Sequence, residues 1–267
     1  MTIHRIAAIV LRQYYLLRGS PSRLLPLFAW VAIDIVLWGF FTRYLDEISP
    51  SGLGTFAALL GAVLLWDFLT RVMQGVTMAF FEDVWSRNFL NFFATPLHIG
   101  EYIAGLVVTG IITSLFGLTA MILVASLVFG LSFAAYGLAL LPFMLVLFLF
   151  GLALGILGSA LVLRLGPAAE WLIWPIPAIL SPFACVFYPL NVLPVWMQAI
   201  ARLMPASYVF EAMRAITQRH EFMTMPLMVA LALASAYLMG AVLVFISVYR
   251  MAVRSGLIAR YSAEAVN

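Results

Sequence analysis

The chain has 267 residues, of which 65% are hydrophobic and only 9% are charged, and its mean hydropathy is +1.11. These values exclude an ordinary soluble domain, in which about 25% of the residues are charged. The basic residues behind its net charge of +3 are all arginines. Because they are scattered along the chain, they do not form the basic patch of a nucleic-acid-binding protein.

The first predicted element is an amphipathic helix within residues 1–20. Apolar residues recur there at helical spacing, while Arg5, Arg12 and Gln13 occupy the other side. We expect this interfacial helix to lie along the membrane surface.

Six apolar runs follow, each near or above the roughly 20 residues that cross a bilayer as a helix. They are residues 24–44, 56–80, 102–129, 138–163, 171–189 and 227–249. The predicted fold class is therefore an all-α membrane protein, a single domain over residues 1–267 with six transmembrane helices.

A polar island, residues 82–101, separates the second run from the third. Asn88 and Asn91 lie in its middle. At helical spacing, its apolar residues gather on the other side of a short helix: Phe89, Leu90 and Phe93. Because a helix this short is marginal alone in water, its apolar side needs a partner, either in the same bundle or in another protein.

The arginines set the expected orientation, since cytoplasmic flanks of membrane spans collect basic residues. With the N-terminus inside and six crossings, nine arginines fall on the inner side, and Arg71 falls within a span. The outer side holds only four: Arg43, Arg202, Arg214 and Arg219. Both termini and residues 82–101 are therefore expected in the cytoplasm.

The fifth run contains Pro175, Pro177 and Pro182, and each proline removes a backbone donor and clashes with the preceding turn. We expect this span to be kinked or broken where protein or water satisfies the freed carbonyls. The next stretch, 190–225, is too polar and too interrupted by prolines to cross. It predicts two short helices joined near Pro205, forming a re-entrant hairpin on the external side, with a surface-lying loop as the alternative.

Two motifs carry a resemblance to a known family. Ala94-Thr95-Pro96-Leu97 closes the polar island, and a P-x-x-x-L-P-x-W pattern starting at Pro189 follows the fifth run. The second motif and its continuation supply the residues expected to form this hairpin, which we also call the re-entrant cap: Pro194, Trp196, Pro205, Tyr208, Glu211 and Arg214. In a six-span chain with an interfacial N-terminal helix, this order resembles the type-2 ABC exporter permeases, the membrane subunits of drug, polysaccharide and lipid exporters.

The resemblance implies that residues 86–93 form a cytoplasmic coupling helix, which seats in a groove of a separate ATP-binding cassette subunit. The residues expected to make that contact are Arg87, Asn88, Phe89, Leu90, Phe93 and Pro96. A folded turn packed on its own bundle is the alternative. The resemblance also implies two permease copies, as a homodimer or as a pseudo-dimer of two related chains, in the bacterial cytoplasmic (inner) membrane.

The expected function is the permease subunit of an ATP-driven exporter, with a pathway for a hydrophobic or amphipathic substrate, drug-like or lipid-linked; a glycan is also open. Without a lysine the chain cannot contain the G-x-x-x-x-G-K-[ST] phosphate loop, so ATP and Mg²⁺ would be bound by the partner subunit. No cofactor, metal site or catalytic residue is expected here, because the histidines lie outside the runs and no Cys/His/carboxylate cluster has metal spacing.

Three charged residues fall inside the predicted spans and away from their ends. Asp67 and Arg71 are four apart and meet on one helix face. Each charge costs about 2.5 to 3.5 kcal/mol at mid-bilayer, so we expect them to pair and to face the bundle. Asp34 has no such local partner and is expected to face polar groups across a subunit interface or a cavity. An ion-coupled secondary carrier that uses these three residues without an ATPase is the alternative function.

Overall fold

The computed structural model describes residues 2–19, 21–48, 55–85, 95–129, 140–219 and 224–256, and every regular element within them is helical. A short first helix is followed by long ones: α1 (Ile3–Arg18), α2 (Pro21–Ile48), α3 (Thr55–Trp85), α5 (Ile99–Phe129), α6 (Leu140–Leu165) and α10 (Thr224–Arg254). Four of the long helices, α3, α5, α6 and α10, are long and apolar enough to cross a membrane. The 28-residue α2 also exceeds the roughly 20 residues that a span needs. The predicted all-helical class is confirmed.

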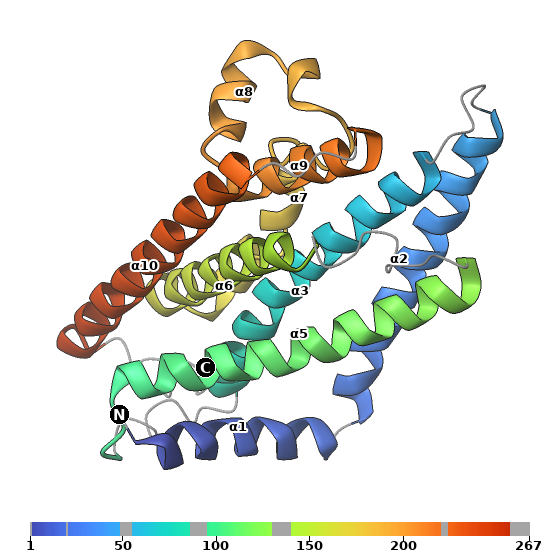
Figure 1. Ribbon diagram of the computed structural model, residues 1–267. Coiled ribbons are helices and arrows are strands. Elements are labelled where there is room, and N and C mark those ends of the chain that lie inside the picture. The colour runs from blue at the N-terminus through green and yellow to red at the C-terminus, as the bar shows by residue number, and fades with distance from the viewer. Residues whose placement is uncertain are drawn as a thin grey trace.

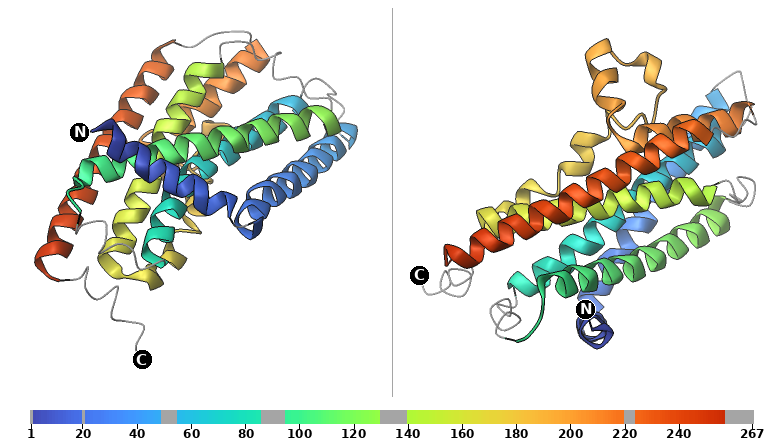
Figure 2. Two further views of the ribbon diagram at one scale, coloured as in Figure 1. Left: turned by 90° about the horizontal axis from the view of Figure 1, so that it is seen from below. Right: turned by 60° about the vertical axis from the view of Figure 1, so that its left-hand side comes forward.

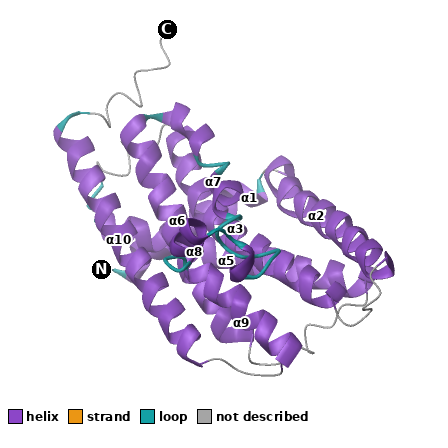
Figure 3. Cartoon of the chain, turned by 90° about the horizontal axis from the view of Figure 1, so that it is seen from above, coloured by secondary structure: helices purple, strands orange, loops and turns teal. Residues whose placement is uncertain are grey.

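The long helices pack in a row. α10 lies against α6, α6 against α3, and α3 against α5, while α2 contacts both α3 and α5. Figure 3 shows α10 and α2 at opposite flanks of this row. In Figure 1 α1 lies at the lower end of the bundle and α8 at the upper end. We name these ends the α1 end and the hairpin end.

Small residues let these helices approach closely. A Cβ on Gly151 of α6 would lie 2.8 Å from the Leu69 carbonyl oxygen of α3, and one on Gly155 would lie 2.8 Å from the Met73 carbonyl oxygen. Such contacts between small residues are how membrane helices associate, because lipid gives no hydrophobic drive between them. Large side chains then fill the space beside the glycines, including the fully buried Phe80, Phe143, Phe150, Phe210 and Phe245.

The predicted fifth span, residues 171–189, does not form one helix. The 3-10 helix η2 (Pro167–Leu172) is followed by the five-residue α7 (Ile176–Leu180) and then by turns. This confirms the predicted break, because each proline removes a helical hydrogen bond. Figures 1 and 2 show the broken segment passing from the α1 end to the hairpin end.

The hairpin region contains η3 (Leu190–Val192), α8 (Val195–Ala201) and α9 (Pro205–Arg219). The predicted pair of helices with a junction at Pro205 is therefore present. α9 packs on α10, α6 and α3 and buries Ala206, Val209 and Phe210. With 15 residues it is shorter than the roughly 20 that would cross a bilayer.

Candidate functional site

The described parts of the polar island, residues 82–85 and 95–101, lie at the α1 end. Five of its predicted contact residues are outside the residues that the structure describes: Arg87, Asn88, Phe89, Leu90 and Phe93. The sixth, Pro96, is exposed in a turn with Thr95, where the Leu97 amide donates to the Thr95 carbonyl oxygen at 2.8 Å. The structure therefore shows the two stems of the island, the last turn of α3 and the first turn of α5.

The α3 stem carries a buried carboxylate. Asp83 is 0% exposed and forms an ion pair with Arg12 of α1. Its other oxygen, Oδ2, accepts a hydrogen bond of 2.7 Å from the hydroxyl of Tyr102 on α5, which is also fully buried. A buried charge is tolerated only when it is paired and hydrogen-bonded, and here the partners come from two other helices.

The α5 stem carries a second buried carboxylate, that of Glu101. Glu101 is 1% exposed and accepts hydrogen bonds from the backbone amides of Thr2, at 2.8 Å, and His98, at 3.1 Å. The bond to His98 is half of a capping box, in which the third helical residue reaches back to the residue before the helix. Nη1 of Arg5 lies 3.2 Å from Glu101 Oε2. The negative charge also suits the positive end of the α5 dipole.

Apolar contact completes this junction. Ile9 of α1 is buried against Gly105 of α5, where a Cβ would come within 2.7 Å of Ile9 Cγ2. Gln13 donates from Nε2 to the Ala79 carbonyl oxygen of α3 at 3.1 Å. The left view of Figure 2 shows α1 lying across the bundle at this end.

We call the ion-paired group the α1 clamp: Arg5, Arg12, Asp83, Glu101 and Tyr102. The sequence pattern predicts that Arg5, Arg12 and Gln13 lie on the polar side of α1, but it does not predict their partners. That side faces the protein, whereas Ile3 and Tyr14 of the apolar side are exposed. The available signal was two arginines seven apart, on one helix face, with an acid at each stem of the island.

The charged residues inside the spans also meet. The predicted pair is confirmed, because Arg71 Nε lies 2.9 Å from Asp67 Oδ2. Asp34, for which the sequence offered no local partner, lies within electrostatic range of both residues. The Arg71 side chain also passes close to Gly117, where a Cβ would be 3.1 Å from its Cδ. The charged cluster thus joins α2 and α3, and its arginine packs against α5.

Within the residues described, no three His, Cys, Asp or Glu side chains are grouped so that they could hold a metal ion.

At the hairpin end, Glu211 and Arg214 of α9 face the broken segment. Arg214 donates to the carbonyl oxygens of Cys185, Val186 and Tyr188 at 2.5, 3.2 and 3.0 Å. Its guanidinium also lies 2.9 Å from Glu211 Oε1, which in turn accepts a 2.8 Å hydrogen bond from the Leu190 amide. One cation therefore satisfies carbonyls in a stretch where helical hydrogen bonding has ended.

We call Arg214, Glu211 and the three carbonyls of Cys185, Val186 and Tyr188 the Arg214 cradle. The other predicted cap residues surround it. Pro194 is the N-cap of α8, and Pro205 opens α9. Trp196 is 63% exposed, with its ring edge-on to Phe183. The hydroxyl of Tyr208 donates to the Arg202 carbonyl oxygen at 2.9 Å, closing the turn between the two helices. The cap residues thus lie together at the hairpin end.

Comparison with known proteins gives one family. The sequence model described as ABC-2 type transporter matches residues 4–217, from α1 to the last turns of α9 and so well over half of the chain. A search of the curated proteins gave no match.

Proposed function

This chain belongs to the ABC-2 type transporter family, whose members are multi-pass permeases of ABC transporters, and we propose that it is the membrane subunit of an ATP-driven exporter. Its partner is a separate ATP-binding cassette subunit, which holds ATP and Mg²⁺. Two copies of the chain flank one pathway in a bacterial inner membrane, with both termini in the cytoplasm. The substrate is hydrophobic or amphipathic, in keeping with the mean hydropathy of +1.11.

The α1 clamp is the observation that supports this proposal most. A segment that receives force from another protein needs a stiff base, and both stems of residues 82–101 are bound to α1 through buried carboxylates. Removing the buried carboxylate of the Arg12–Asp83 pair costs about 3 kcal/mol. A push on the segment therefore moves α1 together with the ends of α3 and α5.

The hairpin provides the opposite boundary of the pathway. α9 is too short to cross a bilayer, and Arg214 ties it to the broken segment. In the proposed mechanism α8 and α9 dip into the outer leaflet as a re-entrant cap. Closure of the ATP-binding subunits then tilts α3 and α5 and opens the path beneath this cap.

A second candidate is the ion-coupled carrier, favoured by the cluster of Asp34, Asp67 and Arg71. Two of these three charges already neutralise each other at 2.9 Å, which fits a structural pair as well as a transport site. The discriminating result is transport driven by an ion gradient in the absence of any ATPase.

The proposed function is tested by isolating the affinity-tagged chain from its native membrane and measuring the ATP hydrolysis that co-purifies. We expect an ATP-binding subunit in the wild-type sample and at least a tenfold loss in a Phe89→Glu variant, because a buried anchor usually dominates an interface. Asn91→Glu adds the same charge on the other predicted side of the segment and is the matched control. Equal recovery from both variants would refute the assigned contact, and no co-purifying ATPase would favour the carrier.

A further inference from the structure

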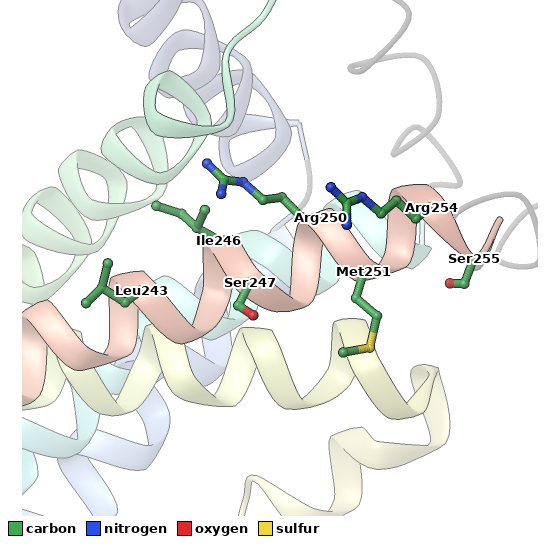
Figure 4. Close-up of a pocket in the computed structure, with 7 residues that line it drawn as sticks. All are labelled: Leu243, Ile246, Ser247, Arg250, Met251, Arg254 and Ser255. Carbon is green, nitrogen blue, oxygen red and sulfur yellow. The ribbon is translucent and has the colours of Figure 1, made fainter.

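The last turns of α10 form an open pocket of about 750 Å³ at the α1 end. All seven residues that line it lie on α10, so it is a hollow along one side of this helix. Figure 4 shows Arg250 and Arg254 on one side of the helix, with Ser247 a turn before them and Leu243 and Ile246 nearer the middle of α10. The pocket is thus basic at one end and apolar at the other.

The two arginines are available for a ligand. They are four residues apart, so their side chains lie one above the other on the same helix face, and both are exposed. In the described part of the chain, neither guanidinium forms an ion pair or hydrogen bond. The buried acids at this end, Asp83 and Glu101, are already bound by Arg12 and Arg5.

The position along α10 fixes the kind of ligand. Residues 224–249 contain no charged side chain, and at 1.5 Å per residue they extend for about 39 Å, more than the roughly 30 Å hydrocarbon core. Arg250 is the first charge after this stretch and so falls at the phosphate layer. Leu243, which is 62% exposed, lies two turns deeper, at the level of the acyl chains.

We propose that Arg250 and Arg254 bind the headgroup phosphate of an anionic phospholipid whose acyl chains lie along Leu243 and Ile246. Guanidinium groups match phosphate oxygens through paired N–H donors, and basic pockets at the cytoplasmic ends of spans are suited to acidic headgroups. A soluble phosphate would use the arginines but not the apolar part of the pocket. This inference does not depend on the proposed export function.

The test measures binding of dioleoyl phosphatidylglycerol to the full chain in detergent by native mass spectrometry, with dioleoyl phosphatidylcholine and inorganic phosphate as competitors. We expect phosphatidylglycerol to bind at least tenfold more tightly than phosphatidylcholine and to resist displacement by millimolar phosphate. The Arg250→Gln/Arg254→Gln variant should lose that preference. Arg164→Gln/Arg202→Gln removes two other exposed arginines and should keep it.

Each contrary outcome overturns the proposal. Equal binding of the two lipids by the wild-type chain would show no anionic headgroup site, and this measurement requires no variant to fold. Displacement by phosphate would make the pocket a soluble-anion site. Loss of preference in both double variants would reduce the effect to overall charge.

Discussion

The two ends of the bundle use charged side chains in different ways. At the α1 end, two buried carboxylates draw partners from helices far apart in sequence, since Arg12 and Asp83 are separated by 71 residues and Thr2 and Glu101 by 99. At the hairpin end, one cation from α9 binds backbone carbonyls of a single neighbouring stretch.

The difference separates two roles. Arg214 replaces backbone hydrogen bonds that the proline-rich segment lacks, so it holds a local shape. The α1 clamp joins three helices to each other, so displacement of one is transmitted to the others. The hairpin end therefore behaves as a fixed boundary, and the α1 end as a linkage.

Removal of Arg214 should have the largest effect on stability. Arg214→Ala leaves three carbonyls and Glu211 without their cation, and we expect a loss of about 4 kcal/mol, measured as thermal unfolding in detergent. Arg202→Ala, at an exposed position in the turn before α9, should change little. If both variants unfold at the same temperature, the hydrogen bonds of Arg214 do not stabilise the broken segment.

Removal of Asp83 should lower the stability somewhat less, but its effect should extend to another helix, α1. Asp83→Ala removes the buried carboxylate with which Arg12 is paired, and Arg12, at 23% exposure, can still reach water. We therefore expect a loss of about 3 kcal/mol and faster hydrogen exchange across residues 3–18. Glu47→Ala breaks the exposed Arg43–Glu47 pair and should cost less than about 1 kcal/mol. Unchanged exchange in α1 after loss of Asp83 would show that the clamp does not hold this helix.

A substitution in the shared middle of the bundle gives a reference for both ends. Gly155→Val places a side chain 2.8 Å from the Met73 carbonyl oxygen and should cost about 1 to 3 kcal/mol by overpacking. Gly240→Val on α10 has open space around it and is the matched control. Equal melting temperatures for the two variants would contradict the close approach of α6 and α3.

The smallest effect is expected within the clamp itself. Glu101 keeps the backbone amides of Thr2 and His98 when Arg5 is removed, and Arg5 is 36% exposed. Arg5→Gln should therefore cost under about 1 kcal/mol, well below Arg12→Gln. The measurement is thermal unfolding of the two variants side by side. A larger loss of stability for Arg5→Gln would show that the Arg5–Glu101 pair contributes more than the Arg12–Asp83 pair.

Much of the fold followed from the sequence because its signals are local. Apolar runs of roughly 20 residues predict spans, and Pro175, Pro177 and Pro182 predict where the helix breaks. The i,i+4 spacing of Asp67 and Arg71 likewise predicts their pairing. In each case the information lies within a few residues of the feature.

The remaining contacts depend on partners that local patterns do not specify. An amphipathic pattern shows that α1 has a polar side, but not that Arg12 would find Asp83. Arg214 binds backbone carbonyls, which every residue carries, so the amino-acid sequence does not indicate which residues are its partners. Asp34 reaches the Asp67–Arg71 pair only because α2 packs beside α3.

The central claim is that force on residues 82–101 reaches α1 through the clamp. Hydrogen exchange of the chain bound to the proposed ATP-binding subunit, with and without a trapped nucleotide, tests it most directly. We expect nucleotide to change exchange in residues 3–18 and 95–105 together, and Arg12→Ala/Asp83→Ala to reduce the response of 3–18, which then reaches α1 only through Glu101 and the α5 contacts, while that of 95–105 persists. A response in 95–105 without one in 3–18 of the wild-type complex would contradict the claim.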